Sequence, residues 1–278
     1  MFDAVAAAYV KHGNVLHSAR AATDEELARV HTRGHIALID GTAGRAAMLD
    51  GDTFASPESA EIARLAAGAA VDAARLAFNR GEPALVLARP PGHHALANTP
   101  MGFCLYNSIA VAAAALRADG RSRVAIVDFD VHHGNGTQAM FYADPNVFYA
   151  STHQYPFYPG TGAAEERGSG AGLGFTLNVP LAAGGRDDVF FRAYEEGILP
   201  AIEAFKPEAL LVSAGFDAHE RDPLGGMKMT SKGFERLMSL VHDTAGRTAA
   251  GREMWIVEGG YHLGALRECL DAAVDVLT

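Results

Sequence analysis

The sequence predicts an α/β fold in which a mostly parallel sheet is covered by helices on both faces. Short β-branched or apolar runs alternate along the chain with longer stretches of helical periodicity, and this order is typical of strand–helix–strand units. No internal repeat, low-complexity linker or change in composition marks a boundary. We therefore expect residues 1–278 to form a single domain.

Six segments have the length and composition of buried strands. They are Ala84–Ala88, Val124–Phe129, Val147–Ser151, Phe175–Val179, Ala209–Ser213 and Met254–Val257. Five stretches have helical periodicity, and Asn79-Arg-Gly81 ends the first of them with a C-cap signal. These predicted helices are Glu58–Phe78, Asn107–Asp119, Asp188–Phe205, Ser231–Ala249 and Leu263–Leu277.

The N-terminal part is less regular. Residues 3–10 suit a short helix, and Thr23-Asp-Glu-Glu26 has the spacing of a capping box that opens a helix toward His31. Residues 40–57 lack periodicity and predict a surface loop. The glycine-rich stretch Gly168–Gly174 precedes a strand, whereas a phosphate-binding loop follows one, so we expect a flexible surface turn there.

Composition restricts the possible partners and compartments. A net charge of −10 argues against nucleic acid or an anionic membrane and is compatible with a cationic substrate, although such charge also serves solubility. Cys104 and Cys269 are the only cysteines and support neither a disulfide framework nor a thiolate zinc site. With no basic segment before Ala4–Val10, and Ala110–Leu116 too short for a bilayer, the cytoplasm is the expected compartment.

Polar or aromatic clusters follow five of the predicted strands. They are Arg89-Pro-Pro-Gly-His-His-Ala95, the run from Asp128 through Asp130, His132 and His133 to Gly136, His153 with Tyr155–Gly160, Gly215 with Asp217, and Glu258-Gly-Gly-Tyr261. Ligands of open α/β sheets bind at the carboxyl ends of the strands. We therefore expect these clusters to lie at one edge of the sheet and to form a site.

A metal centre explains the carboxylates best, because dehydrating them costs several kcal/mol unless a cation compensates. Asp130, His132 and Asp217 would provide three ligands and leave a position open for water, as in catalytic zinc sites. The same ligands would also accept Fe²⁺, Co²⁺ or Mn²⁺.

The remaining clusters complete a hydrolytic site. His93 or His94 could act as general base and acid, and Tyr261 could donate a hydrogen bond to a developing oxyanion. Taken singly, each feature is more often structural, since an Asp-Phe-Asp sequence commonly caps a helix and paired histidines commonly lie on surface loops. Their shared position after strands indicates a metal-dependent hydrolase of an amide or ester.

Several of these motifs occur in a known order. Arg89–Ala95, Gly102-Phe-Cys-Leu-Tyr-Asn107, Asp128–Gln138, Ser213-Ala-Gly-Phe-Asp-Ala-His219, Asp222-Pro-Leu-Gly-Gly226 and Glu258–Tyr261 resemble the motifs of the zinc-dependent histone deacetylase and acetylpolyamine amidohydrolase family. The resemblance covers roughly residues 20–275. The sequence around His93 and around His133 is similar to the class II-like bacterial deacetylase branch.

The resemblance implies an arginase–deacetylase fold, a single deacetylase-like catalytic domain with a mainly parallel eight-stranded sheet between helical layers. It implies that Asp130, His132 and Asp217 bind one Zn²⁺. It implies that His93, paired with Asp128, and His94, paired with Asn135, are the tandem catalytic histidines, and that Tyr261 polarises the acyl carbonyl. It assigns the substrate channel to Gly102, Phe103, Tyr158 and Leu224, and a structural K⁺ to Asp128, Asp130, His132, Ser151 and Thr152. Asp50 and Asp52 are both candidates for the acidic residue that the family often carries at the channel rim.

The implied activity is removal of a short acyl group, acetyl first of all, from acyl-lysine or an acylated polyamine. Two alternatives remain open. A binuclear manganese ureohydrolase would need another bridging carboxylate, and Asp217-Ala-His219 offers none two residues on. A catalytically weak module that binds acyl-amines or a partner protein is the other, because the family's first strand has no counterpart before residues 22–31 and an N-terminal edge strand could be missing. Homo-oligomerisation is also left open.

Overall fold

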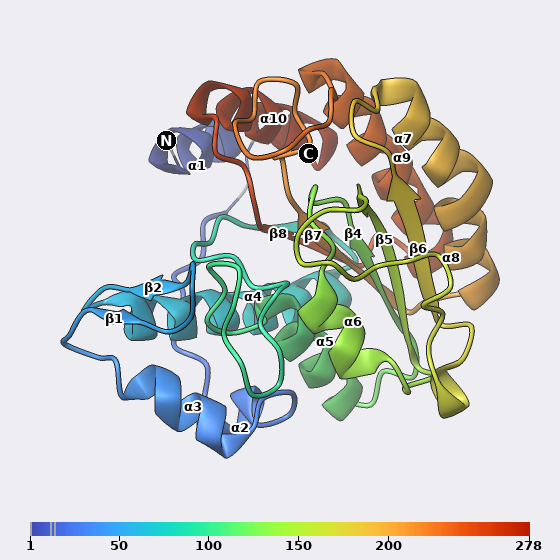
Figure 1. The fold of residues 1–278 in the computed structure, drawn as a ribbon. Helices are drawn as coiled ribbons and strands as arrows, with labels where there is room; N and C mark the ends of the chain where they lie inside the picture. Colours follow the sequence, from blue (N-terminus) through green and yellow to red (C-terminus); the bar gives the residue numbers. More distant parts are fainter. Residues whose placement is uncertain (1, 12, 14) are drawn as a thin grey trace.

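The structure is a computed structural model that describes residues 2–11, 13 and 15–278, and a sheet of six parallel strands forms its centre (Figure 1). The strands lie in the order β3-β8-β7-β4-β5-β6. Their bounds are β3 Ala84–Val86, β4 Val124–Asp128, β5 Val147–Gln154, β6 Thr176–Leu181, β7 Ala209–Ala214 and β8 Glu253–Val257. Because all six are parallel, their carboxyl ends meet at one edge of the sheet.

Helices cover both faces of this sheet and make three layers (Figure 1). One face carries α4 Ser59–Arg80, α5 Ser108–Ala118 and α6 Asn135–Phe141. The other carries α1 Phe2–Lys11, α7 Asp187–Ala193, the π-helix η2 Tyr194–Ile198, α8 Leu199–Phe205, α9 Ser231–Ala249 and α10 Leu263–Val276. Successive residues of a strand point to opposite faces, so Ile126 packs in the first layer and Val127 in the second. The three-layer α/β architecture is confirmed.

Residues 15–58, which precede α4, lie outside the sheet. The short helices α2 Asp24–Leu27 and α3 Arg33–Asp40 are followed by an antiparallel pair, β1 Ala47–Met48 with β2 Phe54–Ala55. Thr23 and Glu26 form the predicted capping box at the start of α2. The turn between β1 and β2 brings the side chains of Asp52 and Thr53 to the backbone N–H groups of Gly102 and Phe103.

All six predicted strands are present, and the predicted helices occur within a few residues of their expected bounds. Several predictions need correction. The helix opened by Thr23 ends at Leu27 rather than continuing to His31, because the chain turns and restarts at Thr32, whose side chain caps α3. Residues 40–57 contain the two-residue strands β1 and β2. The helix expected over Asp188–Phe205 is three segments, since the hydrogen-bonding pattern widens to a π-helix before Pro200.

The strand count also differs from the eight strands that the resemblance implied. Six strands form the main sheet in the described part of the chain, and β1 and β2 form a separate pair. Further pairing after β6 is limited to single bridges, Arg186 with Lys228 and His219 with Met229. An isolated bridge does not extend into a strand, so the sheet ends at β6 on that side and at β3 on the other.

Within residues 2–11, 13 and 15–278, no helix has the combination of length and apolar character that crossing a bilayer requires. The helix α5, which contains the apolar run Ala110–Leu116, has only 11 residues.

Candidate metal centre and active site

The site lies where two neighbouring strands end. β4 and β7 are adjacent in the sheet and pair Asp128 with Ser213, so the loops that follow them leave the sheet side by side. The loop after β4 carries Asp130 and His132, and the turn after β7 carries Asp217. The position is the one that strand-end reasoning predicted, although Asp130 and His132 lie beyond the last strand residue.

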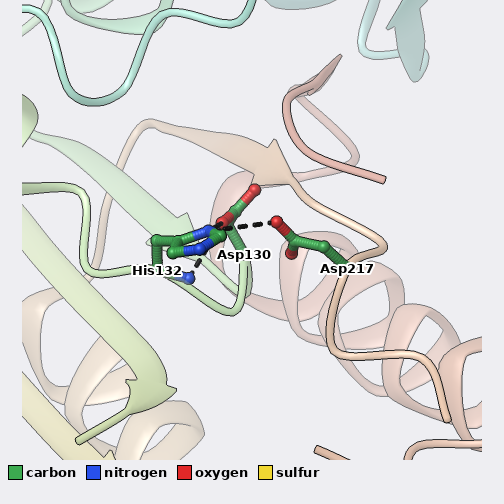
Figure 2. A group of neighbouring side chains, drawn as sticks. All are labelled: Asp130, His132 and Asp217. Carbon is green, nitrogen blue, oxygen red and sulfur yellow. Dashed lines mark hydrogen bonds and ion pairs between the residues drawn. The ribbon is translucent and has the colours of Figure 1, made fainter. Parts of the chain in front are cut away.

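Asp130, His132 and Asp217 converge on one point (Figure 2). One ligand atom from each lies within 4.8 Å of the others. The Nδ1 atom of His132 is 3.1 Å from Oδ1 of Asp130 and 3.1 Å from Oδ2 of Asp217. Three lone-pair donors facing one another in this way need a shared proton or a shared cation between them.

The arrangement of hydrogen bonds fits a cation better. Each carboxylate is fixed by backbone N–H groups, since Val131 N donates to Oδ1 of Asp217 and Gly259 N donates to Oδ2 of Asp130, both at 2.8 Å. Oδ2 of Asp217 is fully buried and has no hydrogen-bond partner among the described residues. A buried carboxylate oxygen in that state is costly unless it binds a positive charge. Two carboxylates and an imidazole are a donor set that Zn²⁺ accepts.

The pKa values of the triad reflect its two carboxylates. Burial disfavours a protonated His132, but the neighbouring carboxylates of Asp130 and Asp217 outweigh it and raise the pKa of His132 to about 10. Burial and the Asp130 carboxylate raise the pKa of Asp217 to about 6. The two carboxylates therefore favour a positive charge at this buried point, which either a protonated His132 or a bound cation can carry.

Two histidines approach the triad from the loop after β3. Nδ1 of His93 is 3.0 Å from Oδ2 of Asp128, and Nδ1 of His94 is 2.8 Å from Oδ1 of Asn135. The rings of His93 and His94 are 4.0 Å apart, and Nε2 of His93 lies 3.8 Å from Asp130. Each histidine thus has one ring nitrogen held by a partner and the other free to face the triad, in the pairing that the resemblance implied.

The environments of these two histidines differ in charge. Burial opposes protonation of His93, yet the carboxylates of Asp128 and Asp130 outweigh it and raise the pKa to about 10. Burial and the neighbouring positive charge of His93 lower the pKa of His94 far below its usual value. Neighbouring groups whose pKa values are driven apart are typical of acid–base pairs in catalysis.

A cavity of about 160 Å³ opens onto the triad and the histidine pair. It is lined by Asp52, Pro91, His93, His94, Gly102, Phe103, Asp130, His132, Phe157, Tyr158, Leu224, Gly259 and Tyr261. Phe103, Tyr158 and Leu224 are partly exposed, so they form the mouth. Phe103 has a φ of 65°, a left-handed conformation that is uncommon for a bulky residue and often occurs at functional sites.

Tyr261 lines the cavity between an aromatic and a cationic group. Its ring meets Phe103 edge to face with centroids 6.0 Å apart, and the guanidinium of Arg89 lies 5.9 Å from its centre. Burial and the Asp130 and Asp217 carboxylates raise the pKa of the Tyr261 hydroxyl. The hydroxyl therefore keeps its proton and is available as a hydrogen-bond donor.

All the residues expected at the catalytic centre and channel come together. The structure adds Pro91 and Phe157 to the cavity wall. The ring of Phe157 stacks on His132 at 5.2 Å, and the sequence signal for it was the aromatic loop after β5. Of the two candidate rim acids, Asp52 lines the cavity, whereas Asp50 caps the turn by accepting hydrogen bonds from the N–H groups of Asp52 and Thr53.

The residues that the resemblance assigned to potassium lie at the ends of β4 and β5. Asp128 pairs with Ser151 across these strands, Thr152 follows it, and all three are buried. Asp130 and His132 follow in the adjoining loop. Asp128, Ser151 and Thr152 therefore lie together across β4 and β5, whereas Asp130 and His132 face Asp217 at the triad.

Comparison with known proteins defines the class. Residues 1–277 match the family model for the histone deacetylase domain. Histone deacetylase 15 of Arabidopsis thaliana is 43% identical over 266 residues, which are 94% of this chain and 48% of the plant protein. A histone deacetylase-like amidohydrolase of Pseudomonas aeruginosa is 44% identical over 271 residues, covering 95% of this chain and 70% of that protein. The crystal structure of the HDA15 HD domain superposes with a TM-score of 0.93 at 40% identity, over 99% of this chain and 79% of that one.

The fold and the site thus define an α/β protein with a candidate hydrolytic metal centre at the carboxyl edge of a parallel sheet. The chain belongs to the histone deacetylase family. It has the arginase–deacetylase fold of that family, and it spans about half the length of the plant relative.

Proposed function

We propose that this protein is a zinc-dependent amidohydrolase, with residues 1–278 forming one catalytic domain, that removes a short acyl group from acyl-lysine or an acylated polyamine. Acetyl is the proposed acyl group. The observation that carries the proposal is that one cavity is lined by Asp130, His132, the two paired histidines and Tyr261, with Asp217 completing the triad behind its wall. Relatives named deacetylase and histone deacetylase-like amidohydrolase support the same reaction class.

Zinc is the proposed metal, held by Asp130, His132 and Asp217. When bound there, Zn²⁺ supplies Lewis acidity, lowering the pKa of a water molecule and polarising an acyl carbonyl. The buried Oδ2 of Asp217, which has no hydrogen-bond partner among the described residues, supports this assignment.

The chain's own groups would move the protons. His93 and His94 face the triad from one side, so the pair can take a proton from the attacking water and deliver one to the leaving amine. Asp128 and Asn135 fix the orientation of the two rings through Nδ1. Tyr261, which keeps its proton, donates a hydrogen bond to the carbonyl oxygen as negative charge develops on it.

The cavity walls suit an extended amine stem. Phe103 and Tyr158 provide aromatic faces at the mouth, with Gly102 and Leu224 beside them. Aromatic side chains stabilise a methylene chain by burying it, and the carboxylate of Asp52 at the rim can accept a hydrogen bond from a substrate N–H. A methylene chain that ends in an acylated primary amine has this shape and chemistry.

We also propose that a potassium ion binds beside the active site at the ends of β4 and β5. The grouping of Asp128, Ser151 and Thr152 there, with Asp130 and His132 in the adjoining loop, supports it. Oxygen ligands suit such a hard cation.

The test is turnover by the purified full chain loaded with zinc. Acetyl-lysine peptide, acetylputrescine and longer acyl-lysines would be compared side by side, with Asp217→Ala as the inactive control. We expect metal-dependent release of acetate from at least one acetylated amine, and loss of turnover on chelation that added zinc restores. Absence of metal-dependent turnover of every acyl-amine tested would reject the proposed function.

A further inference from the structure

Glu258 is a fully buried carboxylate next to the active site that has no part in the proposed chemistry. It follows β8, and its side chain is 1% exposed. Its Oε2 accepts hydrogen bonds from the backbone N–H groups of Gly92 at 2.6 Å and His93 at 3.3 Å. Its Oε1 accepts a hydrogen bond from the hydroxyl of Ser213 at 3.0 Å. It therefore joins the ends of β7 and β8 to the loop that carries the paired histidines.

The register of the sheet explains why Glu258 reaches this loop. β8 lies between β3 and β7, pairing Val86 with Ile256 and Ala214 with Val257. The residue after β8 consequently emerges beside the loop that follows β3, which contains His93 and His94. The backbone N–H of Glu258 donates to Ala214 O, so the main chain at this position is fixed before its side chain makes any contact.

The opposite side of the loop is held by other groups. Nδ2 of Asn107 donates to His93 O at 3.4 Å and to Ala95 O at 3.3 Å, and Thr137 N donates to His93 O at 3.2 Å. The carbonyl groups of the loop thus have several donors. For the N–H groups of Gly92 and His93, Glu258 is the acceptor found within the described part of the chain. Buried N–H groups need an acceptor, so these two N–H groups depend on the Glu258 carboxylate.

We propose that Glu258 is a positioning residue of the reaction, which fixes the His93–His94 loop by its backbone so that both imidazoles face the triad. The proposal rests on the proposed deacylation. Its carboxylate does not contact the substrate or the triad ligands; it acts through the loop. Burial raises the pKa of Glu258 to about 7, so the neutral carboxyl is accessible near neutral pH and a glutamine resembles that form.

Glu258→Gln and Glu258→Ala separate positioning from charge. Glutamine keeps a carbonyl oxygen for the two N–H groups and can donate its own N–H to the Ser213 hydroxyl, whereas alanine leaves both backbone donors unsatisfied. Glu253→Gln is the matched control, because Glu253 is also fully buried but is the first residue of β8, at the opposite end of the strand from Glu258, and bonds to Trp255 and His242. A displacement of about 1 Å in reacting groups costs about 100-fold in rate.

The measurements are kcat, KM, zinc content and unfolding temperature for each full-length, zinc-loaded protein. For Glu258→Ala we expect kcat per zinc-loaded molecule to fall by about 100-fold with KM changed by less than about threefold. Glu258→Gln should recover kcat to within about threefold of the wild type, as should Glu253→Gln. Wild-type kcat in Glu258→Ala, or equal losses in Glu258→Gln and Glu258→Ala, would overturn the proposal.

A second readout does not depend on turnover. On protein labelled with ¹⁵N-histidine, the hydrogen bond between His93 and Asp128 should give a downfield Nδ1–H proton signal in the wild type and in Glu258→Gln. Glu258→Ala should lose or shift this signal, and an unchanged signal would overturn the positioning role. If the wild type turned over no acyl-amine while the signal behaved as expected, the proposed function alone would fail.

Discussion

The ring of Phe103 meets the ring of Tyr261 edge to face, with the two centroids 6.0 Å apart. Phe103 belongs to the loop before α5, and Tyr261 follows β8, so the contact closes one side of the cavity between segments that are far apart in the sequence. The contact involves only the ring of Tyr261, and its hydroxyl takes no part in it. The hydroxyl can therefore be removed with little effect on packing.

Tyr261→Phe is expected to lower kcat roughly 100-fold or more, because it removes one preorganised donor to the developing oxyanion. The ring and its contact with Phe103 remain, so KM, zinc content and unfolding temperature should stay near wild-type values. Steady-state kinetics on the best acetylated substrate check this. A kcat within a factor of about three of the wild type would remove Tyr261 from the proposed mechanism.

Gly259→Ala is expected to disrupt the metal centre without removing a ligand. A Cβ at this position would lie 2.2 Å from Oδ2 of Asp217 and 2.5 Å from Oδ2 of Asp130, so both carboxylates must move. We expect zinc affinity to fall about 10- to 100-fold, as when groups that orient metal ligands are altered. Competition with a chromogenic chelator measures it. Gly246→Ala in α9 is the control, since a Cβ there meets nothing within 4 Å.

Stability should fall as the pH decreases, partly because of His31. This side chain is 3% exposed, donates from Nδ1 toward Leu96 O and accepts from Asn107 N. Burial and the adjacent His35 lower the pKa of His31 to about 3, from an ordinary value near 6.5. The unfolded state then binds more protons between these two values, so the contribution of His31 is complete above pH 6.5 and is lost on acidification toward pH 3.

The measurement is the free energy of unfolding in denaturant at several pH values for the wild type and His31→Gln. One titrating group of this kind contributes a slope of up to about 1.4 kcal/mol per pH unit in the interval. His31→Gln should remove that part of the slope, and the exposed His17→Gln serves as control. Equal slopes in wild type and His31→Gln would contradict the prediction.

Potassium should stabilise the protein more than sodium does. If K⁺ binds at the ends of β4 and β5, it stabilises the native state by mass action, so the unfolding temperature should rise with KCl above the value in equal NaCl. Ser151→Ala should reduce this difference. Ser239→Ala, on the exposed side of α9, should not. Identical unfolding temperatures in the two salts over the whole concentration range would argue against the site.

Sequence reasoning located the sheet because its strands are buried on both faces. Runs such as Val124–Asp128 and Ala209–Ala214 are almost wholly apolar until a polar residue at or next to their last position, Asp128 and Ser213, which marks both the strand and the site beyond it. The triad followed from this pattern, since the carboxyl ends of neighbouring parallel strands share one edge.

Other elements depend on tertiary contacts that the local sequence does not encode. α6 starts at Asn135, and its first turn contains glycine and threonine, which are poor helix formers. Its start is fixed by a tertiary contact, since Thr137 N donates to His93 O. A Cβ on residue 136 would overlap Ala95 O, so only a glycine there lets the helix approach the histidine loop. For α3, the capping side chain of Thr32 was a local signal that could have been used.

The eight-stranded sheet came from the resemblance rather than from the residues of this chain. The six runs that the sequence itself marked as strands are the six that pair. Asp52 could not be chosen from the sequence, because the turn between β1 and β2 places Asp52 rather than Asp50 at the cavity, and two-residue strands leave no periodicity to detect.

The adjacency of β4 and β7 determines when during folding the candidate metal site becomes complete. Asp130 and Asp217 are distant along the chain, so the complete coordination set does not exist until these two central strands have paired. A cation can then stabilise only a chain in which β4 and β7 have already paired. It should therefore slow unfolding far more than it accelerates refolding. If zinc binds this triad as proposed, it binds late in folding and stabilises a sheet that has already formed rather than nucleating that sheet.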